Sequence, residues 1–167
     1  LFALFFSSCF FQQEENKDKR IVNINTISVI IDDQLWNGEV GDSIRNKFVS
    51  PVIGLPKEEP LFTINHYPVR LLEGFVTKTR NSIIIKKENK NTFQIIKNEY
   101  ASPQNVFHIS GKNVAAIVAI IEQKAPAIIQ RIRQTEIEQN QRIIDTARID
   151  SKKINQKFGI GLHIPKG

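Results

Sequence analysis

A long C-terminal segment has apolar residues at every third or fourth position, and this spacing predicts a helical region over residues 113–157. The apolar stripe consists of Ile117, Ile121, Ala125, Ile128, Ile132, Ile137, Ile144, Ala147 and Ile154. Pro126 interrupts the pattern, so we expect a short helix up to about Lys124 and a longer helix after it. At about 1.5 Å per residue the second helix would be about 48 Å long, more than a small domain covers. We therefore expect part of it to contact a protein partner or a missing C-terminal half of the protein.

Short segments rich in apolar residues, which alternate with polar ones in the first two, predict several short strands before this helix. They cover about residues 25–32, 62–67, 82–87, 92–97 and 105–109. Residues 34–48 have the spacing of one or two helical turns followed by a helix, in which Gly38 and Gly41 permit a break or a close approach to the sheet. The polar turn at residues 88–91 predicts that the strands on either side of it form a hairpin.

This order of elements predicts an α+β fold with ferredoxin-like character. We expect a mostly antiparallel sheet with one short helix and one long, Pro-interrupted helix packed on it, together making a domain over residues 21–157. Residues 158–167 begin with the apolar run FGIGLHI. This run predicts a strand that either closes the sheet or starts a truncated second unit.

The first nine residues have the features of the end of a lipoprotein signal peptide. LFALFFSS is apolar and then small, and Cys9 follows directly, as in a lipobox whose cysteine is acylated after cleavage. Residues 10–20 are polar and acidic, which is typical of a flexible linker. A buried apolar strand with an incidental cysteine is the alternative. The lipobox predicts a membrane anchor through an N-terminal lipid, at the periplasmic face or the cell surface of the outer membrane.

The charge distribution argues against a nucleic-acid partner. The formal net charge of +6 is modest, and basic and acidic residues alternate along the long helix, which is typical of a solvated face. These residues are Arg131, Arg133, Glu136, Glu138, Arg142, Asp145, Arg148 and Asp150. A nucleic-acid-binding surface would instead cluster basic residues with aromatic ones. The sequence contains no Met, so we also expect it to begin partway into a longer protein.

The three histidines are the first candidates for chemistry. His66, His108 and His163 fall in three different predicted strands, which could bring them together at a metal ion. No pair has close ligand spacing, however, and the chain has a single cysteine. We therefore expect half-buried structural histidines, with no metal site and no cofactor.

The best carboxylate cluster comes at the end of the first predicted strand and in the loop that follows. Paired acids there could act as general acid and base, although such residues more often cap helices. Trp36 could stack on a sugar or a peptide, but a Trp beside Leu35 and Val40 is more often part of the core. The candidate ligand-binding residues are therefore Trp36, Asp32, Asp33, Asp42, Glu59 and Tyr67. No catalytic residue is assigned.

Three groups of residues resemble the domain-of-unknown-function 4837 family of Bacteroidota lipoproteins. The first is Trp36, Gly38, Gly41, Asp42, Ile44, Arg45, Gly54, Leu55, Pro56, Glu59, Pro60 and Phe62. The others are Arg80 and Asn81 with Ala101, Pro103 and Gln104, and then Phe158, Gly159 and Pro165. The resemblance implies an envelope protein whose second half is missing, and it implies no catalytic residues.

These patterns together predict a lipid-anchored protein of the cell envelope whose folded part is a non-catalytic binding or scaffolding module. One alternative is an envelope hydrolase that uses Asp32, Asp33 or Glu59, which requires a cleft lined by these acids. The other is an assembly subunit that uses the long helix.

Overall fold

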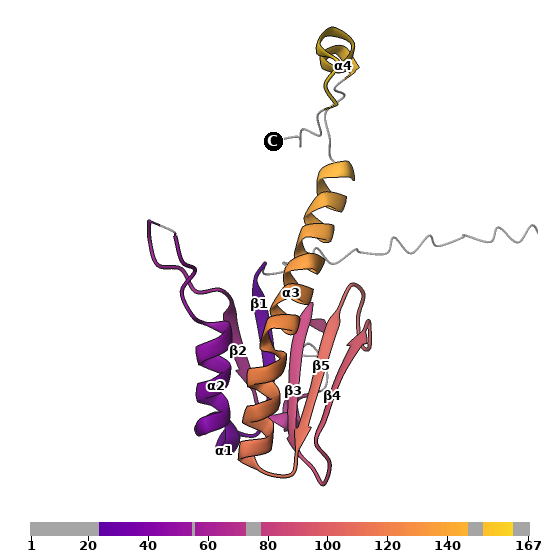
Figure 1. The fold of residues 1–167 in the computed structure, drawn as a ribbon. Helices are drawn as coiled ribbons and strands as arrows, with labels where there is room; N and C mark the ends of the chain where they lie inside the picture. The colour runs from indigo at the N-terminus through magenta and orange to yellow at the C-terminus, as the bar shows by residue number, and fades with distance from the viewer. Residues whose placement is uncertain (1–23, 55, 73–77, 147–151, 162–167) are drawn as a thin grey trace, which may run out of the picture.

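A computed structural model describes residues 24–54, 56–72, 78–146 and 152–161 (Figure 1). The strands are β1 (Thr26–Ile30), β2 (Thr63–Tyr67), β3 (Asn81–Lys87), β4 (Thr92–Lys97) and β5 (Asn105–Gly111). The helices are α1 (Asp33–Trp36), α2 (Glu39–Phe48), α3 (Val114–Thr146) and α4 (Lys152–Phe158), with a 3-10 helix η1 (Val69–Leu71). The five strands predicted before the long helix are thus confirmed close to their expected bounds. The lipobox with Cys9, the linker and His163 lie outside the described residues.

The five strands form one sheet in the order β2-β1-β3-β5-β4, and every pair is parallel except β4 with β5. The α+β class is confirmed, but the prediction of a mostly antiparallel sheet is wrong. The predicted hairpin of residues 82–87 and 92–97 is also wrong, because β5 lies between β3 and β4. The reason lies in the burial of each strand: β3 and β5 are almost entirely buried, whereas β4 is mostly exposed. Strands that are apolar on both faces favour the centre of a parallel sheet, and β4 is suited to the edge.

Helices α2 and α3 cover one face of the sheet and enclose the main core (Figure 1). The part of the predicted apolar stripe from Ile117 to Ile132 packs there, against residues that alternate along β1, β3 and β5, whereas Ile137 does not. The buried core residues are Ile27, Val29, Ile31, Val40, Ile44, Phe48, Phe62, Ile83, Ile85, Phe107, Ile109, Ile117, Ile121, Ala125, Ile128 and Ile132. A smaller cluster on the other face joins Ile30, Ile84 and Val106 to Tyr67 and η1. The central strands are therefore apolar on both faces.

The two covering helices are also joined by a polar contact between Ser43 and Lys47 of α2 and Glu122 of α3. Ser43 Oγ donates a hydrogen bond to Glu122 Oε1 at 2.8 Å, and Lys47 forms an ion pair with the same carboxylate. The hydrogen bonds from Lys47 and then Ser43 lower the pKa of Glu122 below its ordinary value. This contact orients α2 against α3.

The long helix does not break at Pro126, and the predicted division into two helices is wrong. α3 runs without interruption from Val114 to Thr146. Pro126 removes one backbone hydrogen bond, but it lies on the exposed side of the helix, where water can solvate the carbonyl left without a partner. Ala125 and Ile128, on either side of it, are buried in the core and hold both halves in line.

α3 is nevertheless longer than the sheet it covers, as the sequence predicts. Its last buried residue is Glu136, whereas the side chains of Ile137 and Ile143 are 52% and 61% exposed. Figure 1 shows the end of α3 protruding past the edge of the sheet. The strand predicted from residue 158 does not begin there, because Phe158 ends α4 and residues 159–161 are not in a strand.

A candidate ligand site at the carboxyl edge of the sheet

The carboxyl ends of β1 and β3 mark the point where the chain connections diverge. From β1 the chain passes through α1 and α2 to β2 on one side, and from β3 it passes to β4 and β5 on the other. In open parallel sheets, ligands bind outside the carboxyl ends of the strands at such a topological switch point. This edge is therefore where the fold itself favours a binding site.

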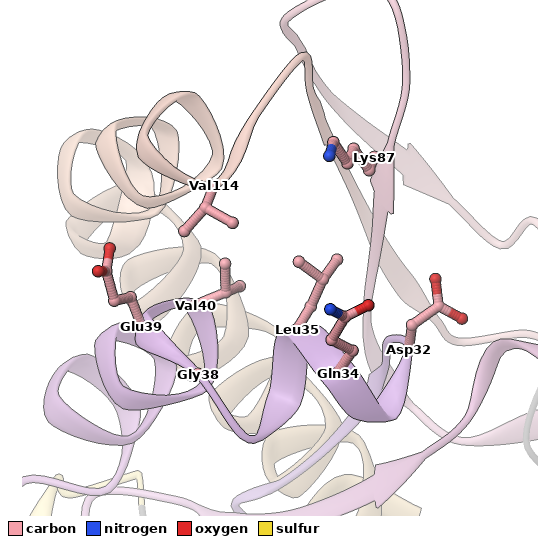
Figure 2. Close-up of a pocket in the computed structure, with 8 residues that line it drawn as sticks. All are labelled: Asp32, Gln34, Leu35, Gly38, Glu39, Val40, Lys87 and Val114. Atoms are coloured by element: carbon pink, nitrogen blue, oxygen red, sulfur yellow. The ribbon is translucent and has the colours of Figure 1, made fainter.

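A pocket of about 270 Å³ lies at this edge. It is lined by Asp32, Gln34, Leu35, Gly38, Glu39, Val40, Lys87 and Val114. Figure 2 shows Leu35, Val40 and Val114 in the middle, Glu39 on one side, Asp32 and Gln34 on the other, and Lys87 opposite. The pocket thus combines an apolar floor with charged groups of both signs at its rim.

The polar side chains of this pocket have no partners within the described part of the chain. Asp32, Gln34, Glu39 and Lys87 make no side-chain hydrogen bond and no ion pair with other described residues. Lys87 and the two carboxylates therefore do not neutralise one another, although they line the same pocket. These groups remain free to bind a ligand.

Of the residues expected to bind a ligand, only Asp32 lines the pocket. Trp36 instead contacts other side chains: its ring stacks on His66 with centroids 4.6 Å apart, and the Arg45 guanidinium lies 4.8 Å from its centroid. Asp33 Oδ1 lies 3.6 Å from His66 Nε2. Asp42 forms an ion pair with Arg45 at 2.7 Å. Trp36 also packs against the main core, in agreement with the structural interpretation of this residue.

Glu59 and Tyr67 lie elsewhere. Glu59 belongs to the segment between α2 and β2, at the amino edge of the sheet and so at the opposite end from Asp32 and Asp33 (Figure 1). Tyr67 packs against the cluster on the face away from α2 and α3. The acids proposed for a hydrolase do not share a cleft, and the described part of the chain does not form the site that this alternative requires.

The two described histidines, His66 and His108, do not converge either. His66 pairs with Val29, whose side chain belongs to the main core, whereas His108 pairs with Ile84 on the opposite face. His108 Nε2 contacts Glu99 Oε2 at 2.6 Å. Partial burial and then Glu99 raise the pKa of the neighbouring Tyr100. Within the described ranges, no group of three or more His, Cys, Asp or Glu residues is placed to hold a metal ion.

A second polar cluster lies at the amino edge of the sheet and is buried. Arg80 and Asn81 both donate to Glu136, with Asn81 Nδ2 3.2 Å from Glu136 Oε1. Asn105 Nδ2 donates to Asn81 Oδ1 and to Thr135 Oγ1, and Arg131 Nε donates to Asn105 Oδ1. The prediction that Glu136 belongs to a solvated helix face is wrong, since Glu136 is only 4% exposed. This cluster fastens α3 to β3 and β5, and its members are satisfied by one another.

The sequence gives only a weak indication of the other pocket residues. Lys87 is the last residue of an apolar strand, and Glu39 opens the helix that follows a glycine. Both positions are typical of the carboxyl edge of a parallel sheet, but this signal is useful only once the strands are known to be parallel. Because the predicted sheet was mostly antiparallel, these positions were not recognised as part of a site.

A family model described as a domain of unknown function, DUF8532, matches residues 21–145. The chain belongs to the DUF8532 family. The resemblance to the domain-of-unknown-function 4837 family is therefore wrong, because the matched family is a different one. The DUF8532 match includes all five strands and nearly all of α3, and so contains both the pocket and the buried cluster.

The other comparisons add no relatives. No curated protein and no solved structure matches the DUF8532 chain significantly. A separate feature bears on the membrane: among the described residues, no helix combines the length and apolar character that a membrane span requires.

Proposed function

We propose that this DUF8532 protein is held at the cell envelope by a lipid on Cys9 and that its folded domain is a non-catalytic binding module. The pocket at the carboxyl edge of the sheet is the observation that carries the binding role. It lies at the topological switch point, and its polar side chains have no partners in the described part of the chain. The fold thus supplies a concave site whose polar side chains are available to bind a ligand.

The lining of this pocket favours binding over catalysis. Its residue types include none of the hydroxyl, thiol and imidazole groups that most often act as nucleophiles or bases. Its two acids, Asp32 and Glu39, are exposed to solvent, whereas a carboxyl that acts as a general acid is normally desolvated. A binding role needs neither feature.

The anchor is supported by the order of features in the N-terminal sequence. An apolar run, two small residues and Cys9 are followed by a polar linker over residues 10–20. A fully extended linker of this length spans about 35 Å, enough to hold a domain clear of a membrane surface. The lipid would place the domain at the outer membrane, on the periplasmic face or the cell surface.

Lipidation is tested by labelling the complete gene product with radioactive palmitate in a bacterial host. We expect the wild-type protein to be labelled and to sediment with membranes, because acylation of Cys9 supplies the anchor. The Cys9→Ala variant should lose both properties, while Ser8→Ala should keep them, since alanine also suits the peptidase pocket. An unlabelled wild-type protein, or label that persists in Cys9→Ala, would refute the anchor.

The binding role is tested by blocking the pocket. A small-molecule library is screened for compounds that raise the melting temperature of the complete protein. We expect hits whose effect disappears in Gln34→Trp, because the indole would occupy the pocket, and persists in Asn46→Trp, an exposed position of α2 outside it. Hits that act equally on both variants, or no hits, would argue against a ligand site at this edge.

A further inference from the structure

We infer that the pocket at the carboxyl edge binds a small amphoteric molecule, with an amine and a carboxylate on a short apolar body, as in a free aliphatic amino acid. This inference deepens the binding role proposed above and rests on it. It follows from three features of the pocket: separated charges of opposite sign, an apolar floor and a small volume.

The first feature is the cationic group at one side. Lys87 is the last residue of β3, a central strand, and it pairs with Gly111 of β5, so its backbone is held in the sheet. Its ammonium makes no ion pair with described residues and faces the pocket opposite the apolar floor (Figure 2). An ammonium in this position binds a carboxylate through charge-assisted hydrogen bonds.

The acidic groups flank the apolar floor and can bind the amine of a ligand. Asp32 follows β1, and Glu39 is the first residue of α2, so they reach the pocket from two sides. Gln34 adds an amide oxygen beside Asp32. A primary ammonium has three N–H donors and no acceptor, so carboxylate and amide oxygens are its natural partners. The charges of Lys87 and the two acids lie too far apart to pair directly, and an amphoteric ligand can bridge them.

The floor and the volume restrict the body of the ligand. Val40 is fully buried, and Leu35 and Val114 pack against the main core, so the floor is rigid and apolar. Burial of a short aliphatic chain against it is favourable. Small-molecule pockets commonly have volumes of about 300 to 1,000 Å³. At about 270 Å³ this pocket falls below that range and favours a ligand of amino-acid size.

The charge requirement is tested by isothermal titration calorimetry on the complete protein with three probes that share the same 3-methylbutyl body. Leucine carries both charges, 4-methylpentanoate lacks the amine, and 3-methylbutylamine lacks the carboxylate. We expect leucine to bind and each analogue to bind at least about tenfold more weakly, because each leaves one set of charged groups unpaired. An analogue that binds as tightly as leucine, or no binding of leucine, would overturn the inference.

Substitutions in the pocket then test which side chain binds which charged group of the ligand. Lys87→Gln should weaken the binding of leucine about tenfold and leave the binding of 3-methylbutylamine unchanged. Asp32→Asn and Glu39→Gln should weaken the binding of leucine and leave the binding of 4-methylpentanoate unchanged. Lys90→Gln, an exposed position outside the pocket, is the matched control and should change nothing. Equal effects of Lys87→Gln and Lys90→Gln would overturn the assignment.

Failure of the inference and failure of the proposed function give different results. If library compounds bind and are blocked by Gln34→Trp, but their binding does not depend on Lys87 or the acids, the site is correct and the ligand class is wrong. If no compound is sensitive to Gln34→Trp, the binding role fails and the inference fails with it.

Discussion

Replacing Glu136 with alanine is expected to lower the free energy of unfolding by about 3 to 5 kcal/mol, the range observed when one partner of a buried ion pair is removed. Glu136 accepts hydrogen bonds from Arg80 and Asn81, and the side chains of Arg80 and Glu136 are only 11% and 6% exposed. Without Glu136, the Arg80 guanidinium stays buried without its counter-charge, and Asn81 loses an acceptor. Urea or thermal unfolding followed by circular dichroism measures the loss.

Two further variants separate this explanation from a general effect of truncating the helix. Glu138→Ala lies two residues further along α3, at an exposed position, and should cost less than about 0.5 kcal/mol. The double variant Arg80→Met with Glu136→Leu should recover at least half of the loss, since no buried charge remains unpaired. If Glu136→Ala and Glu138→Ala destabilise equally, the buried cluster does not hold α3 in place.

The second large effect is expected from Gly41→Ala, which should lower the free energy of unfolding by about 2 kcal/mol or more. An alanine Cβ at this position would lie 1.8 Å from the carbonyl oxygen of Trp36 and 2.7 Å from its carbon. Both atoms belong to the backbone, so the clash is relieved only by moving α1 away from α2. This strain exceeds the gain of up to about 1 kcal/mol that alanine normally brings to a helix. Thermal unfolding of the variant is the measurement.

Gly38→Ala is the matched control for Gly41→Ala. A Cβ at Gly38 would meet nothing closer than the carbonyl oxygen of Gln34 at 3.5 Å, an ordinary contact. We expect a cost below about 1 kcal/mol, which reflects only the weaker preference for alanine at the start of a helix. A stable Gly41→Ala protein would show that α1 and α2 can separate freely. The sequence predicted a break or a close approach to the sheet at these glycines. The structure places the break at Gly38, and the close approach at Gly41 is to α1 and not to the sheet.

Local sequence determined most of the secondary structure. The apolar residues along 82–87 and 105–109, and the three-to-four spacing from Ile117 to Ile132, identify β3, β5 and the buried side of α3. These patterns depend on the period of the backbone and on which side chains leave water, and both are written in consecutive residues. The partial burial of Trp36 in the core followed in the same way from its neighbours Leu35 and Val40.

The tertiary structure alone decided how these elements combine. A polar turn at residues 88–91 is compatible with two arrangements: β4 can pair with β3 in a hairpin, or it can lie on the far side of β5. Only the burial of both faces of β3 and β5 favours the second arrangement. That choice makes the sheet mostly parallel and brings Asp32 and Lys87 to one edge. It also places Glu136, which the sequence suggested was solvated, beside Arg80 at the other edge. Pairing between residues distant in sequence depends on the energy of the whole packed sheet, so neither the pocket nor the buried cluster can be read from local patterns.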